Sequence, residues 1–271
     1  GTPCEMQDIR SFADQCGAVV IEDASHALGS RYATGELVGS CAFSDLTVFS
    51  LHPVKGVTAG EGGVITTNDE KIYHRLEMLR SHGICKGNFD LPGISRGDDS
   101  ILNSDEAFEN GELNPWYYEM QSLGYNYRIT DIQCALANSQ LKKLDMFITR
   151  RKQIAAKYDE LFFDDPLITP KQCQNRENSA HHLYVVEIDF QTAGISRKQL
   201  MEELLKRGYG TQVHYIPIPV QPFYSALGHS IKDFPNTERY YRRALSIPIF
   251  FGLSDEQLEG VAESLKEIVD G

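Results

Sequence analysis

Residues 50–63 read Ser50-Leu51-His52-Pro53-Val54-Lys55-Gly56 and continue as Val57-Thr58-Ala59-Gly60-Glu61-Gly62-Gly63. A single lysine, Lys55, therefore lies between a β-rich run over residues 46–51 and a glycine-rich turn. Glycine lets the backbone approach a ligand closely, and functional groups gather on loops that rigid elements hold. Most loop lysines are nevertheless only solvated charges. A reactive role for Lys55 thus depends on what the rest of the chain contributes.

The length and charge of the chain limit the classes of protein to consider. A chain of 271 residues can bury a large core, and we expect two domains, residues 1–150 and 151–271. The net charge of −12 and the pI of about 5.1 argue against a nucleic-acid partner. There is no apolar run of the roughly 20 residues that cross a bilayer, and no secretory signal. We therefore expect no membrane partner and a cytoplasmic location.

The cysteines and histidines do not form a metal motif. The six cysteines are widely separated, at Cys4, Cys16, Cys41, Cys85, Cys134 and Cys173. Without a C-x-x-C pair, free thiols in a reducing compartment are expected in place of a zinc or redox motif. Neighbouring side chains of a strand point to opposite faces, so His181 and His182 should not chelate a metal together.

The first half of the chain alternates helices and strands. We predict helices over residues 6–16 and from residue 68 to 82, and strands over 18–21, 42–51 and 63–67. This alternation is typical of an α/β fold with a mainly parallel sheet. Asp23 follows the first strand, at the kind of edge where such sheets bind ligands, although a single Asp there is more often a cap.

Residues 84–115 interrupt the alternation with glycine, proline and acidic residues. They predict a long loop that is either partly disordered or a cover over a site. Thr130-Asp131-Ile132-Gln133 is a capping box that begins the next helix, and a second helix is expected over residues 147–162.

The second half predicts a smaller α/β domain. A capping box at Ser196 and a glycine at Gly208 bound one helix, and a cap at Ser254 begins the last one. Further expectations are strands over residues 182–189 and 211–215, and an extended segment over 216–223, because proline disfavours helix.

Four segments follow one another along the chain: Val20-Ile21-Glu22-Asp23-Ala24-Ser25-His26-Ala27-Leu28-Gly29, Phe49-Ser50-Leu51-His52-Pro53-Val54-Lys55, Gly60-Glu61-Gly62-Gly63 and Gly124-Tyr125-Asn126-Tyr127-Arg128-Ile129-Thr130. In this order they resemble the DegT/DnrJ/EryC1/StrS family of pyridoxal-phosphate-dependent nucleotide-sugar aminotransferases. The resemblance extends along nearly the whole chain. It implies the type I fold of these transferases, similar to aspartate aminotransferase, with part of the large domain followed by a small C-terminal α/β domain.

A particular branch of the family is most similar to this chain. The segment Asn114-Pro115-Trp116-Tyr117-Tyr118-Glu119 and the His-Pro-Val-Lys form of the lysine motif resemble enzymes of pseudaminic acid synthesis. Those enzymes aminate a UDP-4-keto-6-deoxy-N-acetylhexosamine, a precursor of bacterial surface sugars. The resemblance therefore implies a nucleotide-sugar substrate, with glutamate as the expected amino donor.

The resemblance also assigns the residues that would bind pyridoxal 5′-phosphate. Lys55 would bond to the cofactor aldehyde and then act as general base and acid. Asp23 would keep the pyridine nitrogen protonated, so that the ring can accept electrons. Ser50 would donate its hydroxyl to the phosphate, and His26 would lie near the ring or its 3′-oxygen. A purely structural role for His26 remains the alternative.

Other implied site residues come from later segments. Asn126 would reach the phosphate in the partner subunit, which implies a homodimer with shared active sites. Arg128 would support the same loop or contact an anionic substrate, and His214 and Tyr215 would line the sugar-nucleotide site. Many relatives carry a histidine shortly after that segment, where this chain has Pro219 or Val220. The resemblance thus specifies the amino-transfer reaction more closely than it specifies the identity of the sugar substrate.

One departure from the family concerns the start of the chain. Family members have a preceding segment with a Gly-Thr-Ala-type turn that binds the phosphate, and with an aromatic residue that stacks on the ring. Gly1-Thr2-Pro3 instead resembles a later segment, so the resemblance predicts an amino-terminally truncated chain. Such a chain is expected to keep Lys55 and Asp23 but to bind the cofactor weakly or not at all by itself.

Two alternatives to the aminotransferase stay open at this point. Sugar dehydratases of the same fold replace the lysine, commonly by histidine, and Lys55 argues against them. The other alternative is an inactive fragment, or a binding module that keeps only the fold. A Walker-type nucleotide site is disfavoured because Gly60–Gly63 is not followed by Gly-Lys-Ser/Thr.

Overall fold

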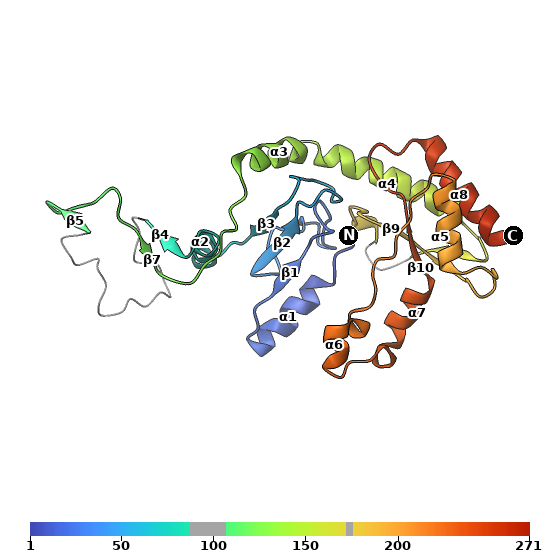
Figure 1. Ribbon diagram of the computed structural model, residues 1–271, viewed down its shortest axis with the longest axis horizontal. Helices are drawn as coiled ribbons and strands as arrows, with labels where there is room; N and C mark the ends of the chain where they lie inside the picture. Colours follow the sequence, from blue (N-terminus) through green and yellow to red (C-terminus); the bar gives the residue numbers. More distant parts are fainter. Residues whose placement is uncertain (87–106, 172–175) are drawn as a thin grey trace.

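The computed structural model describes residues 1–86, 107–171 and 176–271, which form an α/β structure (Figure 1). The first sheet has the order β1 (Ile21–Asp23), β2 (Leu46–Ser50), β3 (Gly63–Thr66), and α1 (Met6–Cys16) precedes it. β1 and β2 are parallel, whereas β2 and β3 are antiparallel. The described sheet is therefore mixed, and only its first pairing meets the expectation of a mainly parallel sheet. A parallel return needs a long crossover, usually a helix, whereas the segment 51–62 simply turns back on β2.

The first strand begins later than the apolar run predicts. Asp45 Oδ2 accepts hydrogen bonds from the Val20 backbone N–H at 2.7 Å and from Arg10 Nη1 at 3.0 Å. The Val20 N–H is thus bound by a side chain. Regular pairing starts at Ile21, which lies opposite Leu46. The strand is consequently displaced toward the acids Glu22 and Asp23.

Helix starts follow the predicted caps closely. Asp69 Oδ1 accepts from the N–H groups of Lys71 and Ile72 and begins α2 (Glu70–Leu79). The capping box of Thr130 and Gln133 begins α3 (Asp131–Leu141), as expected. α4 (Leu144–Leu161) follows almost at once and runs across residue 150, so the domain boundary there stays a prediction.

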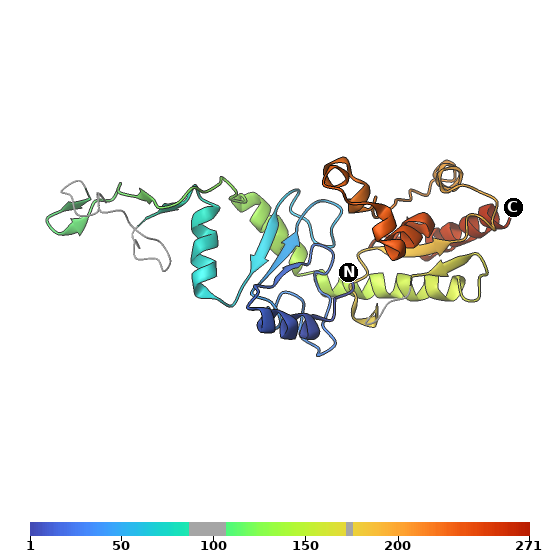
Figure 2. The ribbon, with the colours of Figure 1, turned by 90° about the horizontal axis from the view of Figure 1, so that it is seen from below.

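The long segment after α2 contains short strands. β4 (Ile84–Cys85) pairs with β7 (Glu119–Met120), and β5 (Phe108–Glu109) pairs with β6 (Glu112–Leu113). Figures 1 and 2 place these pairs at one end of the molecule and α8 (Asp255–Asp270) at the other. The expectation for residues 87–106 lies outside the described residues.

The second half is built on an antiparallel sheet with the order β10 (Ala244–Ile247), β9 (Tyr184–Ile188), β8 (Ile168–Pro170). Helices α4, α5 (Arg197–Lys206) and α8 contribute to its core. The capping boxes at Ser196 and Ser254 begin α5 and α8, which confirms both predictions. The strands β8 and β10 were not predicted. Their runs are short, and only the pairing with β9 identifies them.

The segment between α5 and β10 corrects two expectations. Residues 211–215 form no strand and contribute only an isolated bridge between Gln212 and Ser246. Residues 216–223 are not extended throughout: a 3₁₀ turn, η3 (Ile218–Val220), leads into α6 (Pro222–Ala226). η4 (Ile231–Asp233) and α7 (Pro235–Arg243) follow, and η2 (Arg176–Asn178) precedes β9. Proline is accepted in the first turn of a helix, where its missing N–H would have no partner anyway.

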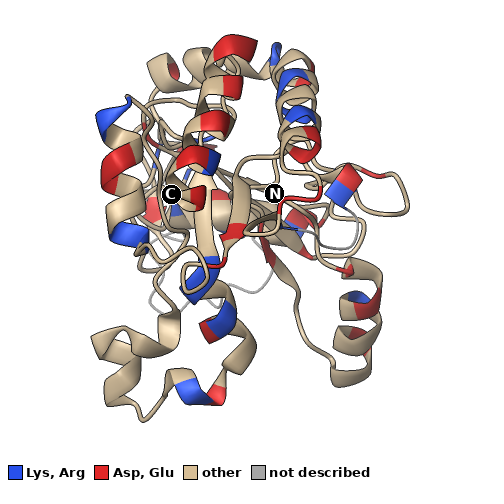
Figure 3. Cartoon of the chain, turned by 90° about the vertical axis from the view of Figure 1, so that its right-hand side faces the viewer, with Lys and Arg blue, Asp and Glu red and all other residues tan. Residues whose placement is uncertain are grey.

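Charged residues of both signs lie along the helices of the described chain. Figure 3 shows acidic and basic residues interspersed along the same helices, without a continuous basic stripe on this side. The cysteines at positions 4, 16, 41 and 134 are free thiols, and Cys173 lies outside the described residues. Within the described ranges, no helix is both long and apolar enough to cross a membrane.

Leu204 and Leu205 of α5 allow a matched test of the C-terminal core. Leu204 is fully buried, whereas Leu205 is 67% exposed. We expect Leu204→Ala to lower the free energy of unfolding by about 2–5 kcal/mol, through lost burial and the remaining cavity. Urea denaturation measures this loss. Leu205→Ala should change it by less than about 1 kcal/mol, and equal losses in the two variants would contradict the packing of α5.

Candidate active site

The site forms where β1 and β2 end. The two strands are parallel, with Asp23 opposite Val48, and the Ala24 N–H donates to the Val48 carbonyl at 2.8 Å. Ser50 is the last residue of β2. The carboxyl ends of parallel strands share one edge of a sheet, and ligands of α/β proteins bind outside that edge. The carboxylate of Asp23 and the hydroxyl of Ser50 therefore belong to the same edge.

Adjacent acids at the end of β1 have different surroundings. Glu22 Oε1 accepts hydrogen bonds from the hydroxyls of Tyr32, Ser44 and Thr47, at 2.7, 2.6 and 3.0 Å. Successive strand residues point to opposite faces, so Asp23 points away from this cluster. The carboxylate of Glu22 therefore stabilises the position of β1, whereas the carboxylate of Asp23 faces the candidate site.

The loop that carries Lys55 is anchored at both ends. The Leu51 N–H donates to the Gly62 carbonyl at 2.8 Å, and the Ala59 N–H donates to the Leu51 carbonyl at 3.0 Å. Leu51, Val57 and Ala59 are buried together. Gly62 has a φ of 140°, and a Cβ there would lie 2.9 Å from the side chain of Ile129. The glycine-rich turn thus serves to fold the loop tightly and to fix the position of Lys55.

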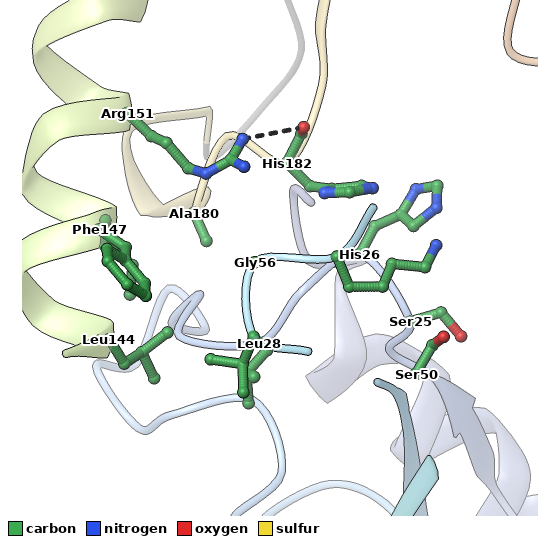
Figure 4. Close-up of a pocket in the computed structure, with 13 residues that line it drawn as sticks. Ser25, His26, Leu28, Ser50, Gly56, Leu144, Phe147, Arg151, Ala180 and His182 are labelled. Carbon is green, nitrogen blue, oxygen red and sulfur yellow. Dashed lines mark hydrogen bonds between the residues drawn. The ribbon is translucent and has the colours of Figure 1, made fainter. Parts of the chain in front are cut away.

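A cavity lies beside Lys55, between this loop and α4 (Figure 4). Its polar lining consists of Ser25, His26, Ser50, Lys55, Arg151 and His182. Its volume is about 20 Å³, which is room for about one water molecule. The cavity alone is too small to enclose a cofactor, but it brings together three residues of the predicted site.

Asp23 and Lys55 influence each other electrostatically. Hydrogen bonds from Ser25 lower the pKa of Asp23, and the charges of His26 and Lys55 add to this effect. Burial lowers the pKa of Lys55, while the negative charge of Asp23 opposes that shift. The result is an ionised carboxylate beside an amine that loses its proton more easily than an exposed lysine does.

Aromatic rings surround His26. Its ring centroid lies 4.4 Å from that of His182, and its Nε2 lies 3.4 Å from the hydroxyl of Tyr215. Burial, together with the charge of Lys55, lowers the pKa of His26 to about 4. Burial also lowers the pKa of His182, to about 3. Both imidazoles are therefore neutral at pH 7.

Arg151 holds this cluster from α4. Its Nη1 donates to the carbonyls of His181, His182 and Ile249, at 3.1, 3.2 and 3.0 Å, and the side chain is buried. A buried guanidinium needs such acceptors to offset its lost hydration. Arg151 thereby joins the segment before β9 and the segment after β10 to the helix that borders the lysine loop.

The structure brings together most of the predicted site residues. Tyr215 reaches His26, and the Nδ1 of His214 lies 2.8 Å from the Ser246 hydroxyl. Asn126 instead pairs with Ser81, and Arg128 donates to the Asn126 side chain at 3.4 Å. Both Asn126 and Arg128 are exposed, and neither lines the cavity.

His182 and Arg151 are members of the site that sequence reasoning missed. His182 was considered only as a metal ligand, together with His181. No local pattern marks either residue, because the chain brings them to the lysine loop from more than ninety positions away. Only the tertiary packing that brings α4 and the segment before β9 beside that loop reveals them.

The residues present fit pyridoxal phosphate. Asp23 supplies a carboxylate that is ionised and can pair with a protonated ring nitrogen. Lys55 supplies a half-buried amine with a lowered pKa, which suits reaction with an aldehyde. The carboxylate and the amine together suit an organic cofactor of this kind. Among the described side chains, no group of three or more His, Cys, Asp or Glu could hold a metal ion.

Two solved structures of similar fold are aminotransferases. Helicobacter pylori PseC, an aminotransferase of pseudaminic acid biosynthesis, superposes with a TM-score of 0.82 at 29% identity, over 99% of this chain and 64% of that one. The sugar aminotransferase Spr1654 of Streptococcus pneumoniae, in a form with pyridoxal phosphate, gives a TM-score of 0.77 at 26% identity, over 99% of this chain and 66% of that one. These likenesses confirm the expected α/β fold of type I transferases.

Sequence comparison gives the same class and identifies the family. The chain belongs to the DegT/DnrJ/EryC1/StrS aminotransferase family, whose sequence pattern matches residues 1–266. It is 35% identical to the spore coat polysaccharide biosynthesis protein SpsC of Bacillus subtilis, over the whole of this chain and 65% of that protein. It is 34% identical to a Campylobacter jejuni UDP-4-amino-4,6-dideoxy-N-acetyl-beta-L-altrosamine transaminase, over the whole of this chain and 64% of that protein. The chain thus spans less than two thirds of the length of these relatives.

Buried histidines next to the site predict a loss of stability in acid. Burial lowers the pKa of His181 from 6.5 to about 4, so below about pH 6.5 the unfolded chain binds a proton that the folded one does not. The free energy of unfolding should therefore fall as the pH falls from 6.5 to 4, by up to about 1.4 kcal/mol per pH unit for each such histidine.

Urea denaturation at several pH values measures this slope. His181→Asn should reduce it, and asparagine tolerates the positive φ of 50° at this position. His229→Asn, which removes an exposed histidine, is the matched control. A wild-type slope in His181→Asn would contradict the prediction.

Proposed function

We propose that this protein is a pyridoxal-phosphate-dependent aminotransferase that aminates a nucleotide-linked keto sugar. The observation that carries the proposal is the Lys55 amine on a rigid loop, electrostatically coupled to Asp23 at the edge of a parallel strand pair. The names and structures of the relatives support it. A dehydratase of the same fold is disfavoured, because Lys55 is present.

Each residue of the site has a task in this proposal. When bound, pyridoxal phosphate supplies an aldehyde carbon and a ring that accepts electrons. Lys55 would hold the cofactor through its amine, whose lowered pKa favours the neutral form more than in an exposed lysine, and its Nζ would take up and return a proton. Asp23, as the anion, holds a proton on the ring nitrogen. Ser50 donates its hydroxyl to the phosphate, and His26, being neutral, adds no second positive charge beside Lys55.

The proposed substrate rests on the names of similar proteins and on the site residues from the second half of the chain, His214 and Tyr215. We propose a UDP-4-keto-6-deoxy-N-acetylhexosamine as amino acceptor and glutamate as donor, as in pseudaminic acid synthesis. Tyr215 reaches the site through its contact with His26, and His214 precedes it. We assign both to the sugar-nucleotide side of the site and Arg128 to anionic substrate groups. The cytoplasmic location expected from composition stays a prediction.

We further propose a homodimer in which each site uses residues of both subunits. No residue of α3 is buried, although the helix carries large apolar side chains. Ile132 is 84% exposed and Leu136 is 42% exposed. An apolar face of this kind indicates a protein partner, and a second copy of the chain is the simplest one. Asn126 and Arg128 lie shortly before α3 and do not line the cavity of their own chain. From there they would complete the site of the partner.

Reductive trapping tests the proposed chemistry. We expect the protein to develop a new absorption band with pyridoxal phosphate, and borohydride to attach the cofactor to Lys55, as mass spectrometry of peptides would show. Lys55→Ala should abolish both the attachment and the amination of UDP-keto sugars by glutamate. Lys71→Ala, at an exposed lysine of α2, is the control and should behave as wild type. Attachment at other lysines only, or no amination of any keto sugar, would refute the proposal.

Mixing two inactive variants tests the shared site. Lys55→Ala and Asn126→Ala chains should each lose amination, Asn126→Ala through weaker cofactor binding. When equal amounts of both chains pair at random, about half of the dimers are mixed, and each mixed dimer has one intact site out of two. About a quarter of the wild-type activity should therefore return. Refolding the chains together and assaying the mixture measures this recovery. No recovery, despite mixed dimers shown by mass spectrometry, would place both residues in the same site.

A further inference from the structure

We propose that Ser25 is a positioning residue that holds one oxygen of Asp23, so that the other oxygen remains for the ring nitrogen of the cofactor. The inference rests on the proposed function, which assigns Asp23 to that nitrogen. It concerns a residue to which neither the family resemblance nor the comparisons give a role.

Two hydrogen bonds from Ser25 meet at the same atom. The Ser25 hydroxyl donates to Asp23 Oδ1 at 2.5 Å, and the Ser25 backbone N–H donates to it at 3.1 Å. Both donors belong to one residue, two positions beyond Asp23 at the start of the turn after β1. Two donors on one oxygen fix the plane and the direction of the carboxylate, because rotation would break both bonds.

The second oxygen of Asp23 is left available. Within residues 1–86, 107–171 and 176–271, the hydrogen bonds recorded for the Asp23 side chain all end on Oδ1. Asp23 is also exposed, whereas Ser25 lines the cavity together with Ser50 and Lys55. Figure 4 shows Ser25 and Ser50 in this lining. A carboxylate held in this way has one free acceptor and a defined orientation, which is what a protonated ring nitrogen requires.

Ser25 also favours the charged form of Asp23. A hydrogen bond to a carboxylate stabilises the anion, and Ser25 is the largest cause of the lowered pKa of Asp23. The other groups that face Asp23 are His26, on the same turn, and Lys55, on the loop after β2. His26 carries its positive charge only below its pKa of about 4, so at pH 7 the contributions come from the Lys55 charge and from the two Ser25 bonds.

Simple turn formation is the competing explanation. An Asp whose side chain accepts the N–H two residues later is a common local structure, and it needs no serine hydroxyl. Ser25→Ala separates the two roles, because it keeps the backbone bond and removes only the bond from the hydroxyl. Ser25→Thr keeps a hydroxyl and serves as the matched control.

The first measurement needs no cofactor. Carbon-13 NMR of labelled aspartate follows the titration of the Asp23 carboxyl, with Asp23→Asn to assign its signal. Ser25→Ala should raise the pKa of Asp23, and Ser25→Thr should leave it near the wild-type value. An unchanged pKa in Ser25→Ala would overturn the proposal, whether or not the protein binds a cofactor.

The second measurement compares pyridoxal phosphate with an analogue whose ring nitrogen is replaced by carbon. We expect Ser25→Ala to bind pyridoxal phosphate about 3- to 10-fold more weakly, with the loss growing as the pH falls, and to bind the analogue as the wild type does. Equal weakening for both ligands would reduce Ser25 to a structural role. If the wild type binds neither, the proposed function fails, and the NMR titration still tests the effect of Ser25 on Asp23.

Discussion

The parallel hydrogen bonding between β1 and β2 places every other part of the site. With Asp23 opposite Val48, the acid and the loop that follows β2 emerge at the same edge of the sheet. A shift of one residue in this pairing would turn Asp23 to the other face. The three hydroxyls on Glu22 oppose such a shift, because a carboxylate so bound cannot move without losing its donors. Two adjacent acids on opposite faces of β1 thus have linked roles: Glu22 stabilises the strand, and the strand orients Asp23 toward the site.

The second constraint is the junction between the halves of the chain. Arg151 binds three carbonyls from two segments of the second half, while its own helix borders the lysine loop. Ser30 also joins the two halves of the chain. Its hydroxyl donates to the Gly1 carbonyl and accepts from the Ala180 N–H. These bonds bring the ring of His182 against His26. The site consequently depends on buried polar contacts in which each acceptor is a backbone carbonyl or a hydroxyl.

Burial and charge then tune the groups at the site. Lys55 and the histidines all have lowered pKa values, because burial disfavours their charged forms, and the positive charge of Lys55 acts in the same direction on the histidines. Asp23 shifts downward as well, because hydrogen bonds and positive neighbours outweigh its burial. One small region therefore combines an ionised acid, an amine with a lowered pKa and neutral imidazoles. That combination suits chemistry in which a single lysine takes up and returns protons.

The sequence by itself determined the features that depend on short stretches of chain. Capping boxes at Thr130, Ser196 and Ser254 begin helices where they were expected, because a cap is a contact among four consecutive residues. The order of motifs also specified the family, and with it the roles proposed for Asp23 and Lys55. The proline-rich segment after residue 216 was misjudged, since proline is compatible with a first helical turn and only the neighbouring chain shows whether a turn forms. The tertiary structure alone decided the antiparallel return of β3, the strands β8 and β10, and the contact of His182 and Arg151 with the site. Those features depend on pairing and burial between segments far apart in the chain, and no local pattern of residues records them.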